Sequence, residues 1–297
     1  QDRAHPGVQR DPDDARCLAR PGHSPRPSER KKILRSSKVL LAVDIGNTVI
    51  HFAVFKDKKM VRTETVATVL NQNVRKELTA LLRRIRQRYS GLGGVVICSV
   101  VPPATSVLEQ FIKKELDQKA CVVGRDVRVP LKNRYTNPRQ VGQDRLVCAY
   151  AAASLYGAPA IVVDLGTAIT VDVVSRRLEY LGGIIVPGIR ITAETLFERT
   201  ALLPLVEIKK PKNLIGKDTQ GSILSGIFYG YGEMIRGLIR LLRQDIKTQP
   251  GPTAKPKVIV TGGHTDLMYP FIKNEVDAVD KNLVFRGLHL LSSMEKL

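Results

Sequence analysis

Two short segments of this chain repeat one pattern, and the repeat limits the folds that the sequence can adopt. In each, an apolar run ends in Asp-x-Gly and small polar residues, from Asp44 to Thr48 and from Asp164 to Thr167. A second run rich in β-branched residues follows each turn, so each segment is typical of a β-hairpin with its aspartate at the tip. The repeat predicts an internal duplication and an α/β architecture in which two similar lobes face each other across a cleft.

The residue types in these turns suit phosphate binding. A carboxylate can hold a cation, a glycine lets the backbone approach a ligand closely, and a hydroxyl can donate to a phosphate oxygen. For one isolated turn, an ordinary Asx turn would be the better interpretation. The recurrence favours a nucleotide cleft between the two turns. The sequence contains neither G-x-G-x-x-G nor G-x-x-x-x-G-K-[ST], which argues against a Rossmann fold and a P-loop.

The net charge raises nucleic acid as a partner. The chain of 297 residues carries a formal charge of +19, but its basic residues are spread along the sequence. It has no Trp and only 5% aromatic residues on which bases could stack. We therefore expect a solvated basic surface and no nucleic-acid partner. No apolar run reaches the ~18 residues that a membrane helix needs, so we expect no membrane partner either.

The remaining composition predicts a compartment and a domain organisation. The four cysteines stand far apart without a C-x-x-C pair, as reduced buried thiols do, and this predicts a cytoplasmic protein. The five histidines show no ligand spacing, so no zinc site is expected. Charged and proline residues with few large apolar side chains predict a disordered, basic, Pro-rich tail over residues 1–37. We expect an N-terminal lobe over 38–157 and a C-terminal lobe over 158–297.

Hydrophobic periodicity predicts the other elements. Helices are expected over 74–89, 106–116, 146–156, 191–197 and from 219 to about 242. Buried strands are expected over 94–100, 121–123 and 257–261. A loop from Tyr135 to Arg145 carries several reactive side chains and leads into the helix predicted to begin at residue 146.

Six sequence blocks, in one order, match a known family. They are Asp44-Ile-Gly-Asn-Thr48, Asn137-Pro-x-x-x-Gly142-x-Asp144-Arg145, Asp164-Leu-Gly-Thr167-Ala, Gly182-Gly-x-Ile-x-Pro-Gly188, Leu203-Pro and Gly216-Lys-Asp-Thr219. With these blocks the chain resembles a type III pantothenate kinase from about Val39 to Leu290. The resemblance implies a duplicated, actin-like, two-lobed fold of the sugar-kinase and heat-shock-ATPase superfamily. It also implies a homodimer that phosphorylates pantothenate with ATP, the first step of coenzyme A synthesis.

The resemblance also implies roles for single residues. The phosphate loop for ATP would comprise Asp44, Ile45, Gly46, Asn47, Thr48, Val49, Ile50 and His51, with a further contact from Thr167. Asp44 can hold Mg²⁺ through water, and Asp164 matches the position that binds a monovalent cation, K⁺ or NH₄⁺. The substrate contacts implied are Tyr135, Gly142, Gln143, Asp144, Arg145 and Thr219, the last from the partner subunit.

Asp144 is the candidate catalytic base. An acidic residue where a helix begins is favoured by the helix dipole alone. Phosphoryl transfer to an alcohol also needs a carboxylate that orients the hydroxyl and accepts its proton, and the family has its base at this aspartate. Arg145 suits the carboxylate of pantothenate, although a surface salt bridge would use the same side chain. Gln143 stands where the family usually has Ala, and its larger side chain could narrow the pantothenate pocket.

Three other interpretations stay open on the sequence alone. A nonenzymatic regulator on the same fold would lose charge at the reacting centre, whereas Asp44, Asp144 and Asp164 are all present. A nucleic-acid-associated role would explain the basic charge and predicts binding that weakens steeply with salt. A kinase of another small alcohol, such as a sugar, would keep the same phosphate-binding turns, because the sequence does not reveal the shape of the substrate pocket.

Overall fold

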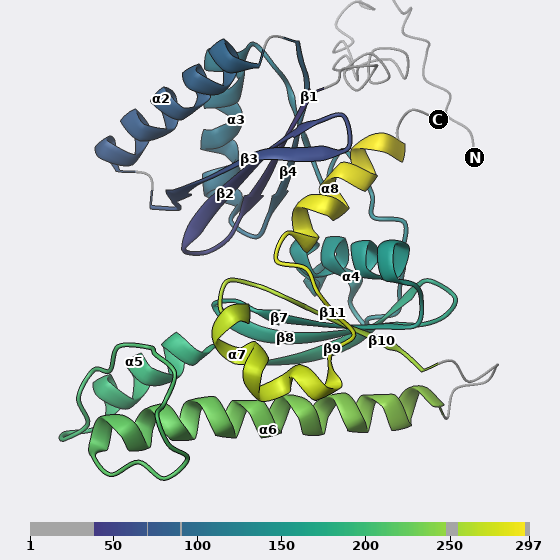
Figure 1. Cartoon of the computed structure of the whole chain (residues 1–297). Helices are drawn as coiled ribbons and strands as arrows, with labels where there is room; N and C mark the ends of the chain where they lie inside the picture. Colours follow the sequence, from purple (N-terminus) through teal and green to yellow (C-terminus); the bar gives the residue numbers. More distant parts are fainter. Residues whose placement is uncertain (1–38, 70, 90, 248–254, 295–297) are drawn as a thin grey trace, which may run out of the picture.

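The structure is a computed structural model that describes residues 39–69, 71–89, 91–247 and 255–294. The tail predicted over 1–37 lies outside these residues. Two mixed β-sheets form the two halves of the molecule, and two helices, α4 (Gln143–Tyr156) and α8 (Leu283–Met294), lie between them (Figure 1). Within the described part, no helix combines the length and the apolar character needed to cross a membrane.

The first sheet has five strands in the order β3-β2-β1-β4-β5. β1 (Val39–Ile45), β2 (Val49–Lys56) and β3 (Lys59–Ala67) form an antiparallel meander, while β4 (Leu92–Ser99) and β5 (Ala120–Val122) run parallel to β1. One face of the sheet packs on α2 (Gln72–Arg88) and α3 (Pro102–Leu116). Alternate residues of β1 enter this core, as the two-residue period of a strand requires.

The second sheet repeats this plan. It contains β7 (Ala160–Leu165), β8 (Ala168–Val174), β9 (Glu179–Pro187), β10 (Lys257–Thr261) and β11 (Ala278–Val279), with a short extra strand β6 (Lys132–Asn133) beside β9. Its order β9-β8-β7-β10-β11 matches that of the first sheet strand for strand, with the same antiparallel and parallel pairs. The predicted duplication is therefore confirmed. Its core is completed by α5 (Ile189–Arg199), α6 (Thr219–Lys247) and α7 (Thr265–Ile272).

The two sheets are joined through α4 and α8. α4 packs its small apolar residues on β7 and β8, and α8 returns to the first sheet, where it covers the face of β1 and β4 that α2 and α3 leave open. α8 thus packs against β1, and β6, which precedes α4, pairs with the second sheet. The division into lobes at residues 157 and 158 stays a prediction.

Four helices begin earlier than predicted, α2 and α5 by two residues each and α3 and α4 by more. α3 begins at Pro102 rather than at residue 106, because the first turn of a helix tolerates proline, whose missing N–H would have no helical partner there. α4 begins at Gln143 rather than at residue 146 and follows a short 3-10 turn, η1 (Pro138–Gln140). Asp144 and Arg145 therefore belong to the first turn of α4. A second 3-10 turn, η2 (Lys273–Glu275), follows α7.

Candidate active site

The aspartates of the repeated turns occupy equivalent positions in the two sheets. Asp44, near the end of β1, pairs with His51 of β2. Asp164, near the end of β7, pairs with Thr170 of β8. Each aspartate also lies beside the parallel strand of its own sheet, β4 or β10. Because both turns lie at the carboxyl ends of parallel strands, where open α/β sheets bind ligands, they present their polar groups at the same edge of each sheet.

The two turns are closed by the same backbone hydrogen bond but differ in length. The N–H of Gly46 donates to the carbonyl of Val49 at 3.1 Å, and the N–H of Gly166 donates to that of Ala168 at 3.2 Å. The first turn is one residue longer because it includes Asn47. In both turns the polar side chains after the glycine are exposed to solvent. The two hairpins therefore place their aspartates in the same way, but the first turn has two polar side chains after its glycine and the second has one.

A third carboxylate, that of Asp144, lies close enough to act on both turn aspartates. Burial, together with the negative charges of Asp144 and Asp164, raises the pKa of Asp44 to about 8. Burial, together with the charges of Asp144 and Asp172, raises the pKa of Asp164 to about 7. Burial also raises the pKa of Asp144, whose Oδ1 accepts from the backbone N–H of Arg145 at 2.8 Å. The carboxylates of Asp44, Asp144 and Asp164 therefore lie near one another, and burial and mutual repulsion disfavour their ionised forms.

These carboxylates fit cations that arrive together with phosphate groups. In the described part of the chain, no three His, Cys, Asp or Glu side chains are close enough to enclose a metal ion by themselves. Nucleotide-bound Mg²⁺ typically takes one or two protein carboxylates and fills its other positions with phosphate oxygens and water. A set of carboxylates whose charge is disfavoured, but which does not form a closed cage, suits that arrangement.

Arg145 is fixed by a buried carboxylate that the sequence analysis did not single out. Its Nε and Nη2 donate to Oδ1 of Asp172 at 3.0 and 2.6 Å. Asp172 lies on β8 with only 1% of its surface exposed. It also accepts hydrogen bonds from the hydroxyls of Tyr180 at 2.6 Å and Thr170 at 3.1 Å. The Nη1 atom of the guanidinium takes no part in these bonds.

The Gly182-Gly183 pair of β9 makes room for this ion pair. A Cβ atom on Gly183 would lie 2.6 Å from Oδ1 of Asp172 and 2.7 Å from Nη2 of Arg145, distances that no real side chain tolerates. Gly182 has a φ of +125° and lies against the ring of Tyr135. That ring is 6.4 Å from the ring of Tyr180, measured between centroids. The structure therefore brings Tyr135 and Arg145, two of the residues predicted to contact substrate, to the same part of β9; their contact with substrate stays a prediction.

The remaining predicted site residues lie in different surroundings. Ile45 and Ile50 are fully buried in the first core, so their side chains support the turn between β1 and β2 from behind. Gly142 caps α4 beside the Asp144 carboxylate. The side chain of Gln143 lies against Gly124. Val49 is half-buried and His51 exposed on β2.

Thr219 is the predicted residue that a single chain does not bring to the site. It is exposed and begins α6, whose first turns lie beside α5, on the opposite side of the second sheet from α4 (Figure 1). No interaction found among the described residues joins it to the aspartates of the same chain. Its neighbour Asp218 caps the helix by accepting from the N–H of Gly221 at 2.6 Å.

The family model described as type III pantothenate kinase matches residues 40–241. The chain belongs to the type III pantothenate kinase family. It is 40% identical over 258 residues to the type III pantothenate kinase of Moorella thermoacetica, which covers 85% of this chain and 98% of that protein. It is 37% identical over 257 residues, with the same coverages, to that of Halalkalibacterium halodurans. The predicted family and the kinase activity are confirmed, and the nonenzymatic alternative is not favoured.

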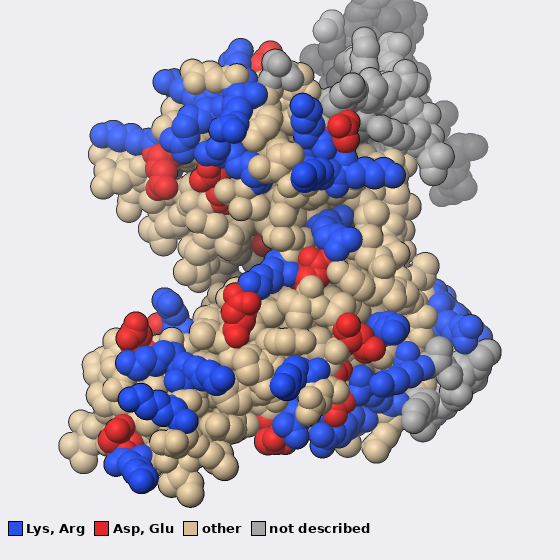
Figure 2. All heavy atoms as spheres, viewed as in Figure 1, with Lys and Arg blue, Asp and Glu red and all other residues tan. Residues whose placement is uncertain are grey.

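The fold of this pantothenate kinase is that of the actin-like ATPases. MreB 5 of Spiroplasma citri, solved bound to AMPPNP, superposes with a TM-score of 0.50 over 88% of this chain and 98% of its own, at 10% sequence identity. A likeness at that identity concerns the fold alone. It confirms the predicted duplicated, two-lobed architecture. Figure 2 shows a notch between the two lobes, with Lys and Arg side chains spread over both lobes rather than gathered around it.

Proposed function

We propose that this pantothenate kinase transfers the γ-phosphoryl group of ATP to the primary hydroxyl of pantothenate, with Asp144 as the base. The observation that carries the assignment is that Asp144 lies near both turn aspartates and directly precedes the anchored Arg145. The hydroxyl oxygen bonds to the γ-phosphorus as the bond from that phosphorus to the bridging oxygen of ADP breaks. The hydroxyl proton passes to the Asp144 carboxylate, whose raised pKa suits it to accept a proton.

The two turns divide the binding of ATP and its cations. Asn47 and Thr48 in the longer turn, with Thr167 in the shorter one, are exposed donors for phosphate oxygens. Asp44 would hold Mg²⁺, and Asp164 would hold a monovalent cation, K⁺ or NH₄⁺. When bound, these cations offset the negative charge of the phosphates and of the carboxylates around them. The raised pKa values of Asp44 and Asp164 support this role, because a cation restores the ionised form that burial disfavours.

Pantothenate would bind between α4 and β9. Its carboxylate would meet the Nη1 end of Arg145, because Asp172 engages Nε and Nη2. Tyr135, which lies against Gly182 nearby, would pack along the substrate. Asp172 acts through Arg145 and is therefore a positioning residue.

A homodimer would complete the site. Thr219 lies away from Asp144 within one chain, so its predicted substrate contact needs a second copy. Large apolar side chains are exposed on α5 and on the segment that leads to Thr219, namely Phe197 (48% exposed), Leu202 (92%), Leu214 (62%) and Ile215 (77%). Exposed apolar groups of this size typically mark an interface. We infer that this surface joins two chains and that Thr219 of the partner subunit contacts pantothenate.

The test of the base is Asp144→Asn, assayed by ADP release with ATP, Mg²⁺ and pantothenate in potassium and in sodium buffer. We expect kcat to fall by at least about 10³-fold, within the range for loss of a general base, with little change in ATP binding. Asp266→Asn is the matched control, because Asp266 also lies in the first turn of a helix, α7, and should not affect turnover. A variant that keeps a tenth of the wild-type turnover, or wild-type protein that phosphorylates only other alcohols, would contradict the proposal.

A mixing experiment tests the shared site. Thr219→Ala and Asp144→Asn should each be strongly impaired alone. After subunit exchange, mixed dimers carry one intact site, so equal amounts of the two variants should recover about a quarter of the wild-type activity. Activity that stays at the average of the two separate variants would contradict a site completed by the partner subunit.

A further inference from the structure

A pocket on the first lobe is lined by basic side chains that the proposed reaction does not use. Its volume is about 340 Å³, at the lower end of the range for small-molecule sites. It lies between β3 and the last two turns of α2, and its lining residues are Arg62, Arg84, Ile85, Gln87, Arg88 and Tyr89. None of these is among the residues assigned to ATP, the cations or pantothenate.

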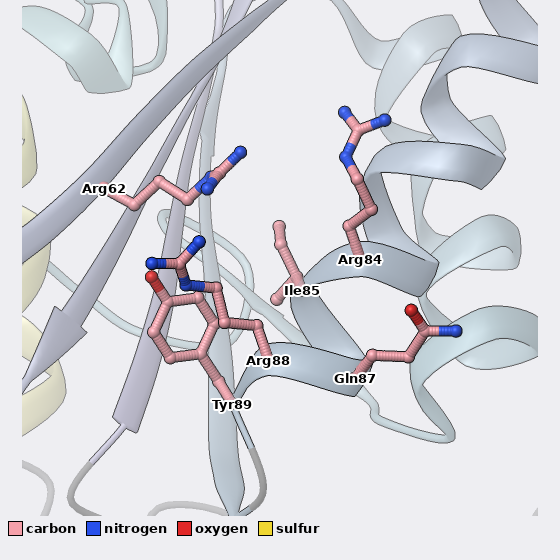
Figure 3. A pocket seen from close by; sticks show the side chains of 6 residues that line it. All are labelled: Arg62, Arg84, Ile85, Gln87, Arg88 and Tyr89. Atoms are coloured by element: carbon pink, nitrogen blue, oxygen red, sulfur yellow. The ribbon is translucent and has the colours of Figure 1, made fainter.

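The basic groups reach the pocket from two elements. Figure 3 shows the guanidinium groups of Arg62 and Arg88 near each other on one side, with that of Arg84 across from them and Ile85 between. The side chain of Gln87 points away from this group. The helix dipole favours basic residues in the last turn of α2. It does not account for Arg62, which reaches the same space from β3.

The pocket retains positive charge after its internal contacts are counted. Nε of Arg62 donates to Glu64 at 2.7 Å. Within the described residues, no hydrogen bond or ion pair engages the side chains of Arg84 and Arg88. By contrast, Arg83 on the same helix is paired with Glu115 at 2.8 Å. Three arginines and one glutamate thus leave a net charge of about +2 around the pocket.

The arginines around the pocket repel one another when no anion is bound. Like charges four residues apart on a helix repel each other, and Arg84 and Arg88 have that spacing. Arg62 adds a third positive charge beside Arg88. A bound dianion would offset this repulsion, and guanidinium groups match the oxygens of a phosphate group in pairs. A phosphate monoester carries a charge of about −1.5 to −2 at neutral pH, close to the charge that the pocket leaves uncompensated.

We propose that this pocket is a second ligand site, specific for a small molecule that carries a phosphate group. The phosphate lies between Arg84 on one side and the Arg62–Arg88 pair on the other. The ring of Tyr89 provides apolar surface for the organic part of a phosphate ester, and Ile85, only 2% exposed, closes the pocket between the arginines. The proposal is independent of the phosphoryl transfer argued above, because it concerns a different lobe surface and different residues.

The test is calorimetric titration of the full chain with its nucleotide cleft saturated by AMPPNP and Mg²⁺, so that added phosphate cannot bind there. Inorganic phosphate is titrated in one arm and glycerol 3-phosphate in the other, at constant ionic strength. We expect one site per chain, and Arg84→Ala/Arg88→Ala should weaken binding at least about tenfold. Lys76→Ala/Lys114→Ala is the control, because it removes two exposed positive charges outside the pocket and should change the affinity less than about twofold. The arm with the tighter binding identifies the source of the phosphate group.

A charge-conserving variant separates recognition from simple attraction. Arg84→Lys/Arg88→Lys keeps both charges but loses the planar forks, so we expect an intermediate loss of affinity. Kinase turnover of all three double variants should equal that of the wild type, which shows that they are folded. The proposal is overturned if wild-type protein binds neither probe, or if the alanine variant binds as tightly as the control. It is also overturned if a single-stranded oligonucleotide displaces glycerol 3-phosphate with a steep salt dependence, because the arginines would then belong to a nucleic-acid surface.

Discussion

The two hairpins share one register, yet they differ at the position that faces the helices between the sheets. Ala53 on β2 pairs with the residue two places before Asp44, and Asp172 on β8 pairs with the residue two places before Asp164. Both positions are buried. Ala53 packs in the apolar cluster under α8, whereas Asp172 binds Arg145 of α4. The same place in the repeat therefore holds a methyl group in one lobe and a carboxylate in the other.

This difference shows where the two halves have specialised. Both keep an aspartate at the tip of the hairpin, where it can meet a cation. Two residues further from the tip, the first hairpin contributes an apolar packing residue and the second contributes the carboxylate that fixes Arg145. A buried ion pair contributes little net stability, because the cost of removing its charges from water offsets their attraction. The presence of Asp172 at this position is therefore better explained by its hold on Arg145 than by stability.

The largest expected effect comes from neutralising the two tip aspartates in turn. Asp44→Asn should lower kcat by about 10³-fold, because Asp44 is proposed to hold the ion that neutralises the transferred phosphoryl group. Asp164→Asn should lower it by about 10²-fold and abolish the difference between potassium and sodium. The measurement is kcat at saturating Mg²⁺ in each salt.

The control for this pair is Asp57→Asn. Asp57 lies at the tip of the β2–β3 turn with a φ of 55°, which asparagine also tolerates, so turnover should be unchanged. Equal losses for the two tip variants, with the response to potassium intact in both, would mean that the two turns have not divided the cations as proposed.

A reciprocal change tests the position two residues further from the tip. Ala53→Asp would bury a carboxylate under α8, in the apolar cluster that contains Phe285 and Leu288. We expect the free energy of unfolding to fall by about 3–5 kcal/mol, the cost of an unpaired buried charge, as measured by urea denaturation. Ala53→Val is the control for added volume and should cost about 1–3 kcal/mol. A stable Ala53→Asp variant would show that the first hairpin accepts charge as readily as the second.

A smaller and more selective effect is expected for Asp172→Asn. Loss of the charge partner should let the guanidinium of Arg145 move, so kcat/KM for pantothenate should fall about 30-fold, which corresponds to about 2 kcal/mol. For the analogue in which an alcohol replaces the carboxylate, the fall should stay below about threefold. A purely structural role would lower both values alike. If this variant does not fold, Tyr180→Phe removes one hydrogen bond to Asp172 and should show the same selectivity, more weakly.

The sequence predicted the hairpins because their signal is local. Asp-x-Gly between two β-branched runs defines both the turn and, through the two-residue period, the face of each side chain. The same local pattern does not predict that Asp172 is buried and paired. A single aspartate in an apolar strand reads as an exposed strand position, and only its contact with Arg145, 27 residues earlier, reveals a buried partner.

Two other features were beyond local patterns for different reasons. The polar residues from Gln143 to Arg145 are as typical of a loop as of a first helical turn, so the start of α4 was predicted too late. Thr219 was correctly predicted to begin a helix, but its distance from Asp144 depends on how the second sheet is built. Its proposed role depends further on a second copy of the chain.

The smallest expected effect is on stability against pH, measured as Tm without nucleotide and with EDTA. The pKa of Asp44 is about 8 and that of Asp164 about 7 in the folded state, against an ordinary value of 3.8. Between about pH 4 and pH 8 the folded state therefore holds protons that the unfolded state has released, so rising pH favours unfolding. We expect Tm to fall by at least roughly 5 °C from pH 5 to pH 8, as for a loss of at least about 2 kcal/mol.

Single substitutions turn this pH dependence into a comparison of the two turns. Asp44→Asn should remove the larger part of the fall in Tm, because the pKa of Asp44 is raised further than that of Asp164. Arginine lowers the pKa of other carboxylates, such as those of Glu115 and Glu179. These groups make the fold more stable as pH rises through about 4, so they do not change Tm between pH 5 and pH 8. If Asp164→Asn removed the larger part of the fall in Tm instead, the ionised form of Asp164 would be disfavoured more strongly than that of Asp44. The cation proposed for Asp164 would then stabilise the fold more than the Mg²⁺ proposed for Asp44.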